Sequence, residues 1–265
     1  MFEAETEAFW QSTSHRVLVA TVAELHRQRR LLQEQIGFHR VNGARTIISD
    51  LFIAGAGIEV GGGDRPFPVK EGVSVTYGDI RNSFELRRHF GNDEAVVCGA
   101  INAESFEGIG HESVDFIISA HVIEHLANPL GSILEGLKRI KTGGVYVIAI
   151  PDMRHTFDRY RAPTTYDHLV EDLRSGGEPS LIDAYRDHVK LVHPIYGAPI
   201  ADEQQENEAQ MLLAARMDTH VHCWTRETFN DHVAKVIEGL AEIALETALE
   251  NEILVVLRKV NLPLV

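Results

Sequence analysis

The stretch Gly57-Ile-Glu-Val-Gly-Gly-Gly-Asp-Arg-Pro66 decides the fold. An apolar pair that carries a glutamate runs into three consecutive glycines, which is the pattern of a short buried strand that stops at a tight turn. Only glycine takes positive φ without strain and lets the backbone lie flat against a ligand. At the carboxyl end of the first strand of an open α/β sheet, such a turn holds a nucleotide-like cofactor. An ordinary loop can also contain three glycines, so the rest of the sequence has to distinguish a cofactor-binding turn from a loop.

Apolar runs alternate with helical patterns on both sides of this stretch. Strands are predicted at 73–79, 95–98, 114–119, 145–150 and 252–258, with helices at 129–140 and near 226–238. This alternation predicts a Rossmann-like, doubly wound, mostly parallel seven-stranded α/β sheet. Right-handed crossovers place the carboxyl ends of the parallel strands on one rim. On that rim we expect Gly61 to Asp64, Asp79, Asn102, Ser119 to His121, and Pro151 with Asp152.

Two segments lie outside the alternation, within what we read as a single domain over 1–265. Apolar residues at helical spacing predict one or two amphipathic helices over 6–36, as part of an N-terminal helical cover over 1–45. These helices are expected to pack on the sheet, and a homodimer contact is the alternative. Residues 155–218 are rich in His, Asp, Glu and Arg and predict an inserted, helical lid over the rim. The acidic run at 203–208 is typical of a solvated surface.

Composition excludes several classes of protein. A formal charge of −14 over 265 residues opposes binding to nucleic acid, whose affinity rests on Lys and Arg. No apolar run reaches the ~18 residues of a membrane span, and the amino terminus is acidic where a secretory signal is basic. We therefore expect a cytoplasmic protein without a membrane partner. Cys98 and Cys223 are too few and too far apart for a disulfide framework and are predicted as buried thiols.

Three strings, in order, resemble the motifs of class I S-adenosylmethionine-dependent methyltransferases. They are Gly57-Ile-Glu-Val-Gly-Gly-Gly63, Val114-Asp-Phe-Ile-Ile-Ser-Ala-His-Val-Ile-Glu-His-Leu126 and Leu137-Lys-Arg-Ile-Lys-Thr-Gly-Gly-Val-Tyr-Val-Ile-Ala-Ile-Pro-Asp152. A bacterial subgroup associated with glycan or secondary-metabolite biosynthesis is similar in more detail. It shares Gly-Asp-Arg-Pro in the glycine loop and strings like Thr156-Phe-Asp-Arg159, Thr164-Thr-Tyr-Asp-His168 and His220-Val-His-Cys-Trp-Thr225.

The resemblance implies S-adenosylmethionine as cofactor and assigns residues to it. Glu59 would orient the glycine turn, with a cap of backbone amides as its alternative role. Asp79 would take both ribose hydroxyls, with a helix cap as its alternative. The other implied cofactor residues are Gly61 and Gly63 in the turn, Asn102 and Ala103 at the adenine, and Ser119 and His121 at the rim. Arg65 and Pro66 depart from the family, because many relatives have a third glycine and a helix start there.

The string His121-Val-Ile-Glu-His125 has a second interpretation. His-x-x-Glu-His is also the motif of inverted zinc peptidases, in which both histidines share one helix face. Such an enzyme carries the motif well inside a long helix, whereas here it follows a buried strand directly. The methyltransferase resemblance predicts a similar Glu-His pair in this place, and we favour it.

Methyl transfer to a hydroxyl needs a positioned acceptor and a proton acceptor, for which histidine is suited near neutral pH. The candidates are His121, His155, His220 and His222. If their segment is extended, His220 and His222 point the same way. Asp152 and His155 could join them as ligands of a divalent metal that acidifies a sugar hydroxyl. Hydrogen-bonded structural histidines around Trp224 are the alternative for each one.

These features predict a methyltransferase that acts on a small molecule, foremost by O-methylation of a sugar, a sugar nucleotide or a secondary metabolite. Nitrogen acceptors stay open. A NAD-dependent oxidoreductase is disfavoured because Pro66 stands where Gly-x-Gly-x-x-Gly needs its last glycine. A non-catalytic protein that binds S-adenosylmethionine as a sensor or partner subunit is the other alternative.

Overall fold

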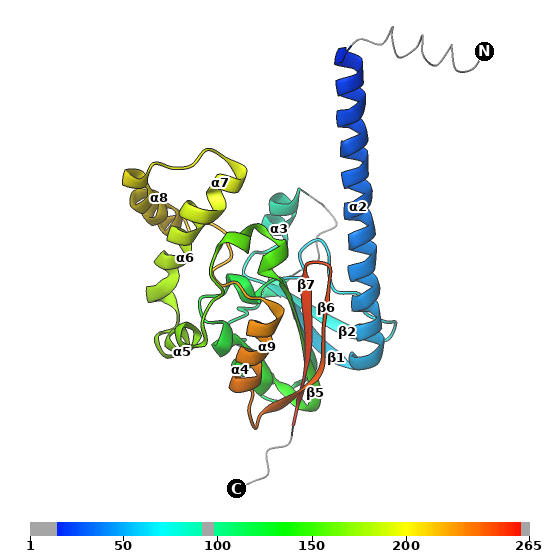
Figure 1. Ribbon diagram of the computed structural model, residues 1–265. Helices are drawn as coiled ribbons and strands as arrows, with labels where there is room; N and C mark the ends of the chain where they lie inside the picture. The colour runs from blue at the N-terminus through cyan, green and yellow to red at the C-terminus, as the bar shows by residue number, and fades with distance from the viewer. Residues whose placement is uncertain (1–14, 92–97, 261–265) are drawn as a thin grey trace, which may run out of the picture. The chain divides into compact units, whose positions relative to one another are not determined.

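The computed structural model describes residues 15–91 and 98–260 (Figure 1). The chain divides into two compact units, Met1–Gly43 and Ala44–Val265, whose boundary falls inside the long helix α2 (His15–Phe52). In the described part of the chain, every helix is too short or too polar to cross a bilayer.

Helix α2 replaces the one or two helices predicted over 6–36, of which residues 6–14 lie outside the described ranges. Exposed apolar side chains on this helix include Val17, Val22, Leu25 and Ile36. The predicted roles of this segment as a cover over 1–45 or as a dimer contact stay predictions.

The second unit is built on a seven-stranded sheet in the order β3-β2-β1-β4-β5-β7-β6. All neighbours pair in parallel except β7, which runs antiparallel to both β5 and β6. The predicted mostly parallel, seven-stranded sheet is therefore confirmed. Most of the strand predicted at 95–98 falls outside the described residues. The strands are β1 (Ala56–Val60), β2 (Ser74–Asp79), β3 (Gly99–Ala100), β4 (Val114–Ala120), β5 (Ile140–Pro151), β6 (Ala241–Leu249) and β7 (Glu252–Lys259).

Apolar side chains alternate between the two faces of this sheet, as the pleat requires. On one face, Ile117 and Ile148 pack with side chains of α4 (Pro129–Arg139) and α9 (Arg226–Val236). Figure 1 shows these two helices beside each other against the sheet. On the other face, Ile118 and Val147 pack with Ile48, near the end of α2, and with neighbouring loop residues. Both faces are covered, which explains why the central strands are almost continuously apolar.

The connection from β1 to β2 has an unusual form. Residues 61–73, all of them described, contain turns and extended backbone but no helix. Phe67 fills the space beside the sheet and is fully buried. The departure at Arg65 and Pro66 thus marks a real difference, because the glycine turn returns to the sheet without a helix behind it.

The insertion predicted over 155–218 is helical, and a small apolar core forms around Leu181, Tyr185 and Val189. It follows β5 and precedes α9, and its helices lie together in Figure 1. The helices from the end of β5 to the end of the insertion are η2 (Met153–His155), η3 (Phe157–Tyr160), α5 (Tyr166–Ser175), η4 (Glu178–Ser180), α6 (Leu181–Asp187), η5 (His188–Val192), α7 (His193–Tyr196) and α8 (Asp202–Ala214).

Two further helices connect strands of the sheet. Between β2 and β3, α3 (Ser83–Phe90) starts with a capping box from Asn82. After β4 comes the short helix η1 (Ile123–His125).

Both cysteines are free thiols, but only one is buried as predicted. Cys223 is buried beside the insertion, while Cys98 is half-buried at the start of β3.

Candidate active site

The glycine turn packs directly on the residues that follow β4. Gly61 and Gly63 have φ of +71° and +54°, which disfavours any residue with a side chain. A Cβ at Gly61 would lie only 2.3 Å from Cγ2 of Val122. The turn after β1 and the turn after β4 therefore meet on one rim, as the right-handed crossovers predict.

Glu59 lies fully buried under this turn. Its Oε1 accepts a hydrogen bond from the backbone N–H of Phe67 at 2.8 Å, so a role in capping a backbone amide is present. Within the described residues, Oε2 has no hydrogen-bond partner. Burial raises the pKa of Glu59 to about 7, although the Phe67 N–H and the nearby charge of Arg45 lower it in part. The carboxyl group thus sits near its midpoint at neutral pH.

This raised pKa predicts a pH-dependent stability. Glu59 is disfavoured in its charged form in the folded chain, so its contribution to stability is fully present below pH 4.5 and is lost as the pH rises through about 7. The loss amounts to about 3 kcal/mol, taking about 1.4 kcal/mol per pKa unit. We expect urea unfolding to show that the free energy of unfolding of the wild type, measured relative to Glu59→Gln, falls by about this amount between pH 5 and pH 8. The exposed Glu71→Gln serves as control; parallel pH profiles for Glu59→Gln and wild type would contradict the assignment.

Asp79 and Asn102 end the neighbouring strands. Asp79 is nearly buried, and its Oδ1 accepts the backbone N–H of Arg81 at 2.8 Å. The Oδ1 of Asn102 accepts the backbone N–H groups of Glu104 and Ser105 at 2.7 and 3.2 Å. The side-chain acceptor predicted to meet adenine therefore already closes a turn. The carboxylate of Asp79 keeps its second oxygen for a ligand.

The residues after β4 form a charged cluster, in which His121 has a left-handed φ of 56°. Its Nε2 lies 2.9 Å from Oε1 of Glu252, and its Nδ1 lies 3.4 Å from Oε1 of Glu124. Burial lowers the pKa of His121, but its contacts with Glu124 and Glu252 raise it to about 9. His121 is therefore an imidazolium at neutral pH and does not suit the predicted role of proton acceptor. Arg45 forms a buried ion pair with the same Glu252.

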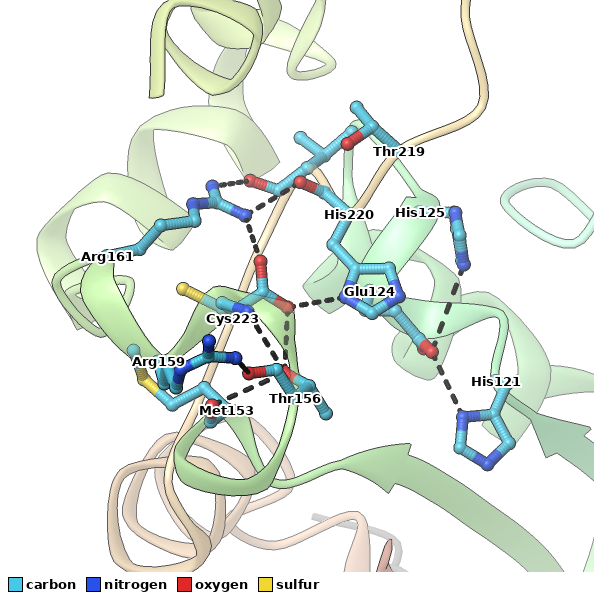
Figure 2. Close-up of polar contacts among 12 residues, drawn as sticks. His121, Glu124, His125, Met153, Thr156, Arg159, Arg161, Thr219, His220 and Cys223 are labelled. Carbon is cyan, nitrogen blue, oxygen red and sulfur yellow. Dashed lines mark hydrogen bonds and ion pairs between the residues drawn. The ribbon is translucent and has the colours of Figure 1, made fainter. Parts of the chain in front are cut away.

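Glu124 occupies the centre of this cluster and is 1% exposed (Figure 2). Burial raises its pKa, but His121, His125 and His220 outweigh that effect and lower it. The Nε2 of His125 lies 3.9 Å from Oε1 of Glu124, and its Nδ1 lies 2.9 Å from Asp218. Asp218 also pairs with Arg81 at 3.0 Å, two residues after Asp79. Ion pairs thus connect the Asp79 loop to the cluster.

His220 completes the cluster from the end of the insertion. Its Nδ1 lies 2.6 Å from Oδ2 of Asp158, and its ring lies 4.8 Å from that of His125. Arg161 donates to Oδ1 of Asp158 at 2.9 Å and to the carbonyl oxygens of His220 and Val221. Figure 2 labels Arg161 and His220 and marks their polar contacts with dashed lines. The result is an imidazole whose Nδ1 is held by a carboxylate.

His222 points to a different place, so the predicted pairing with His220 is wrong. The chain bends at Val221, where the N–H groups of Val221 and His222 both bond the Glu124 carbonyl. Alternation along a strand therefore does not apply. His222 is fully buried, and its Nε2 lies 3.7 Å from Oδ2 of Asp172. Burial lowers the pKa of His222 to about 3, and without solvent contact it cannot serve as the base.

The predicted metal set of Asp152, His155, His220 and His222 is not assembled either. Asp152 pairs with the Arg154 guanidinium at 2.6 Å, and His155 is exposed on η2. Two other groups bring their ligand atoms within 4.8 Å of one another: Glu124 with His125 and His220, and His168 with Asp172 and His222.

Ser119 also differs from its predicted place. It is fully buried in β4 and shares the face of Ile117 toward α4, rather than projecting from the rim. The His-x-x-Glu-His string is not helical throughout, because η1 begins only at Ile123. His121 and His125 therefore do not share a helix face, as the peptidase motif requires.

Several residues of the cluster carry no sequence signal. Asp158 lies in the string Thr156-Phe-Asp-Arg159, whose resemblance to a subgroup singled it out without assigning it a role. Arg81, Asp218 and Glu252 come from a loop, the end of the insertion and the start of β7. Their contacts depend on tertiary structure alone.

The comparisons with known proteins concern the fold. No protein-family model and no curated protein matches the chain. A Rhodobacter sphaeroides structure assigned as a Zn-dependent alcohol dehydrogenase is similar over 83% of this chain and 89% of its own, at 13% identity and a TM-score of 0.53. A SAM-dependent methyltransferase from Thermotoga maritima matches 89% of this chain and 95% of its own, at 14% identity and a TM-score of 0.48. One from Aquifex aeolicus matches 77% and 82%, at 15% identity and a TM-score of 0.40.

Likeness at these identities shows the fold alone, and the two scores below 0.5 support no conclusion about activity. The strand order of the sheet can be compared directly with that of nucleotide-binding folds. The nucleotide-binding order 3-2-1-4-5-6 ends in a parallel strand, whereas here the reversed β7 lies between β5 and β6. The sheet is therefore Rossmann-like, with one reversed strand inserted next to its edge strand β6.

Proposed function

We propose that the chain is an S-adenosylmethionine-dependent methyltransferase that acts on a hydroxyl group of a small molecule. The observation that carries the proposal is the glycine turn, with positive φ at Gly61 and Gly63, between the carboxyl groups of Glu59 and Asp79. S-adenosylmethionine offers a sulfonium, an ammonium and a ribose diol. Carboxyl groups on both sides of the turn suit the two cations and the diol.

The backbone that follows this turn disfavours NAD as the cofactor. A pyrophosphate is held by the N-terminus of the helix that follows the glycine loop, where free N–H groups and the helix dipole favour negative charge. This chain has no such helix in residues 61–73, and its carboxyl groups would repel a pyrophosphate. The dehydrogenase assigned to the Rhodobacter sphaeroides structure therefore finds no support in this turn.

The cluster around Glu124 supplies the chemistry that a non-catalytic binding protein does not need. The acceptor oxygen attacks the methyl carbon, and the carbon–sulfur bond breaks with its electron pair moving to sulfur, which leaves S-adenosylhomocysteine. The hydroxyl proton passes to Nε2 of His220, and Asp158 stabilises the imidazolium that forms. The imidazolium of His121, between Glu124 and Glu252, holds the neighbouring carboxylates in place.

The proposed class of methyl acceptor is inferred from residues in and next to the insertion. The strings that resemble the glycan and secondary-metabolite subgroup contribute Asp158 and His220, which pair with each other at this cluster. Sugars, sugar nucleotides and hydroxylated secondary metabolites are therefore the first acceptors to test, with amines as the alternative class.

The test is release of S-adenosylhomocysteine. The protein is incubated with S-adenosylmethionine and a panel of sugars, sugar nucleotides, phenols and amines. We expect release that depends on a hydroxyl acceptor and that rises with its concentration. A protein that binds the cofactor but releases no product with any acceptor class would support the sensor alternative and contradict the proposal.

A further inference from the structure

We propose that His168, Asp172 and His222 form a site for one divalent transition-metal ion of the zinc class. The site fastens helix α5 of the insertion to the segment 220–224. It is separate from the cluster around Glu124, and the proposed methyl transfer leaves all three side chains unused.

The three ligand atoms already have the spacing of a metal site. His168 and Asp172 lie four residues apart on α5, so they share one helix face. Nε2 of His168 lies 3.2 Å from Oδ2 of Asp172, and Nε2 of His222 lies 3.7 Å from the same oxygen. A tetrahedral zinc ion with bonds of 2.0–2.1 Å separates its ligand atoms by about 3.3 Å. The ligands therefore need to move little to bind.

Burial gives an independent reason for a ligand at this place. Asp172 and His222 are each 0% exposed. Among the described residues, Oδ2 of Asp172 has no hydrogen-bond partner of good geometry, and the polar atoms that face it are Nε2 of His168 and Nε2 of His222. Buried polar atoms without partners are costly, and a cation bound between them would satisfy Oδ2 and Nε2 together.

The surroundings suit a metal site as well. The Ser180 hydroxyl donates to Oδ1 of Asp172, which fixes the carboxylate as outer-shell partners do. The ring of His222 stacks on Trp224 with a centroid distance of 5.6 Å. His168 is 38% exposed and opens a route from solvent. Two imidazoles and one carboxylate suit zinc, cobalt, nickel or iron, and leave a fourth position for water.

The other group of possible ligands is a weaker candidate. His125 is paired with Asp218, His220 with Asp158, and Glu124 faces the additional histidine His121. These polar groups therefore already have charged partners, and a metal ion there would displace them. Around Asp172, by contrast, the ion pairs of the two histidines are those with the Asp172 carboxylate itself, that is, between the proposed ligands.

The consequence for function concerns the position of His220. His222 follows it by two residues, and the bend at Val221 lies between them. A metal ion on His222 would hold this bend and make His168, Asp172 and His222 positioning residues. This role rests on the proposed methyl transfer, whereas the binding of the metal does not.

The test uses the full chain, freed of metal with a chelator and titrated with Zn²⁺ by calorimetry and with Co²⁺ by visible absorption. We expect one ion per chain and a metal-dependent rise in melting temperature. His168→Ala, on the exposed side of the site, should weaken Zn²⁺ binding at least a hundredfold and remove the rise, and Asp172→Asn should act in the same direction. The exposed His111→Ala and the rival-site variant Glu124→Gln should bind as wild type does.

The proposal is overturned if the wild type binds no Zn²⁺, if His168→Ala and Asp172→Asn keep its affinity, or if Glu124→Gln alone loses it. Titration of the same samples with S-adenosylmethionine separates the two proposals. Metal binding without cofactor binding contradicts the methyltransferase but not the site, and cofactor binding without metal binding contradicts only the site.

Discussion

Replacing His220 by alanine is expected to lower the rate of methyl transfer by about two to four powers of ten, the range that a general base contributes. The affinity for S-adenosylmethionine should not change, because His220 lies in the charged cluster and not in the glycine turn or the Asp79 loop. Release of S-adenosylhomocysteine under saturating acceptor measures the rate, and calorimetry measures the affinity.

Two further variants sharpen this prediction. Asp158→Asn keeps the shape of the carboxylate but removes its charge from Nδ1 of His220, so we expect an intermediate loss of rate and a shifted pH profile. His111→Ala removes an exposed histidine that lies before β4, away from the rim, and should retain the wild-type rate. A His220→Ala variant that is folded and fully active would contradict the assignment of the base.

Replacing Asp79 by alanine is expected to weaken binding of S-adenosylmethionine by about a hundredfold, because each hydrogen bond to a charged group contributes about 1.5–3 kcal/mol. The variant removes the carboxylate at the end of β2 to which we assign the ribose hydroxyls in the proposed function. Calorimetric titration with S-adenosylhomocysteine measures the loss without turnover.

Asp79 also accepts the N–H of Arg81, so alanine could disturb the loop itself. Asp79→Asn retains one acceptor for that N–H and should lose affinity to a smaller degree, with an unchanged melting temperature. Asp167→Asn changes an exposed carboxylate on α5 and serves as the matched control. Equal affinity of wild type and Asp79→Asn would remove Asp79 from the ribose site.

The sheet could be predicted because its signals are local. Nearly continuous apolar runs such as Val114–Ala120 reflect burial on both faces, and Gly61 carries the positive φ that its sequence context indicates. The handedness of parallel crossovers predicted that the carboxyl ends of these strands lie on one rim of the sheet. The strand order and the antiparallel direction of β7 were not predicted, because nothing local in the sequence marks either one.

The candidate site was predictable only in part, because its geometry depends on distant segments. Glu252 and Asp218 reach His121 and His125 from β7 and the insertion, and no periodicity marks such pairs. The direction of His222 was mispredicted because one bend at Val221 cancels the alternation of an extended chain. Pro66 indicated from the sequence that the backbone after β1 departs from that of relatives. The absence of a helix in residues 61–73, and what this means for the cofactor, became clear only from the structure.

Calorimetric titration of the wild-type chain with S-adenosylmethionine, S-adenosylhomocysteine and NAD tests whether the glycine turn holds a methyl donor. We expect S-adenosylmethionine and S-adenosylhomocysteine each to bind at one site per chain, and NAD to give no binding heat. Tight binding of NAD alone would contradict it.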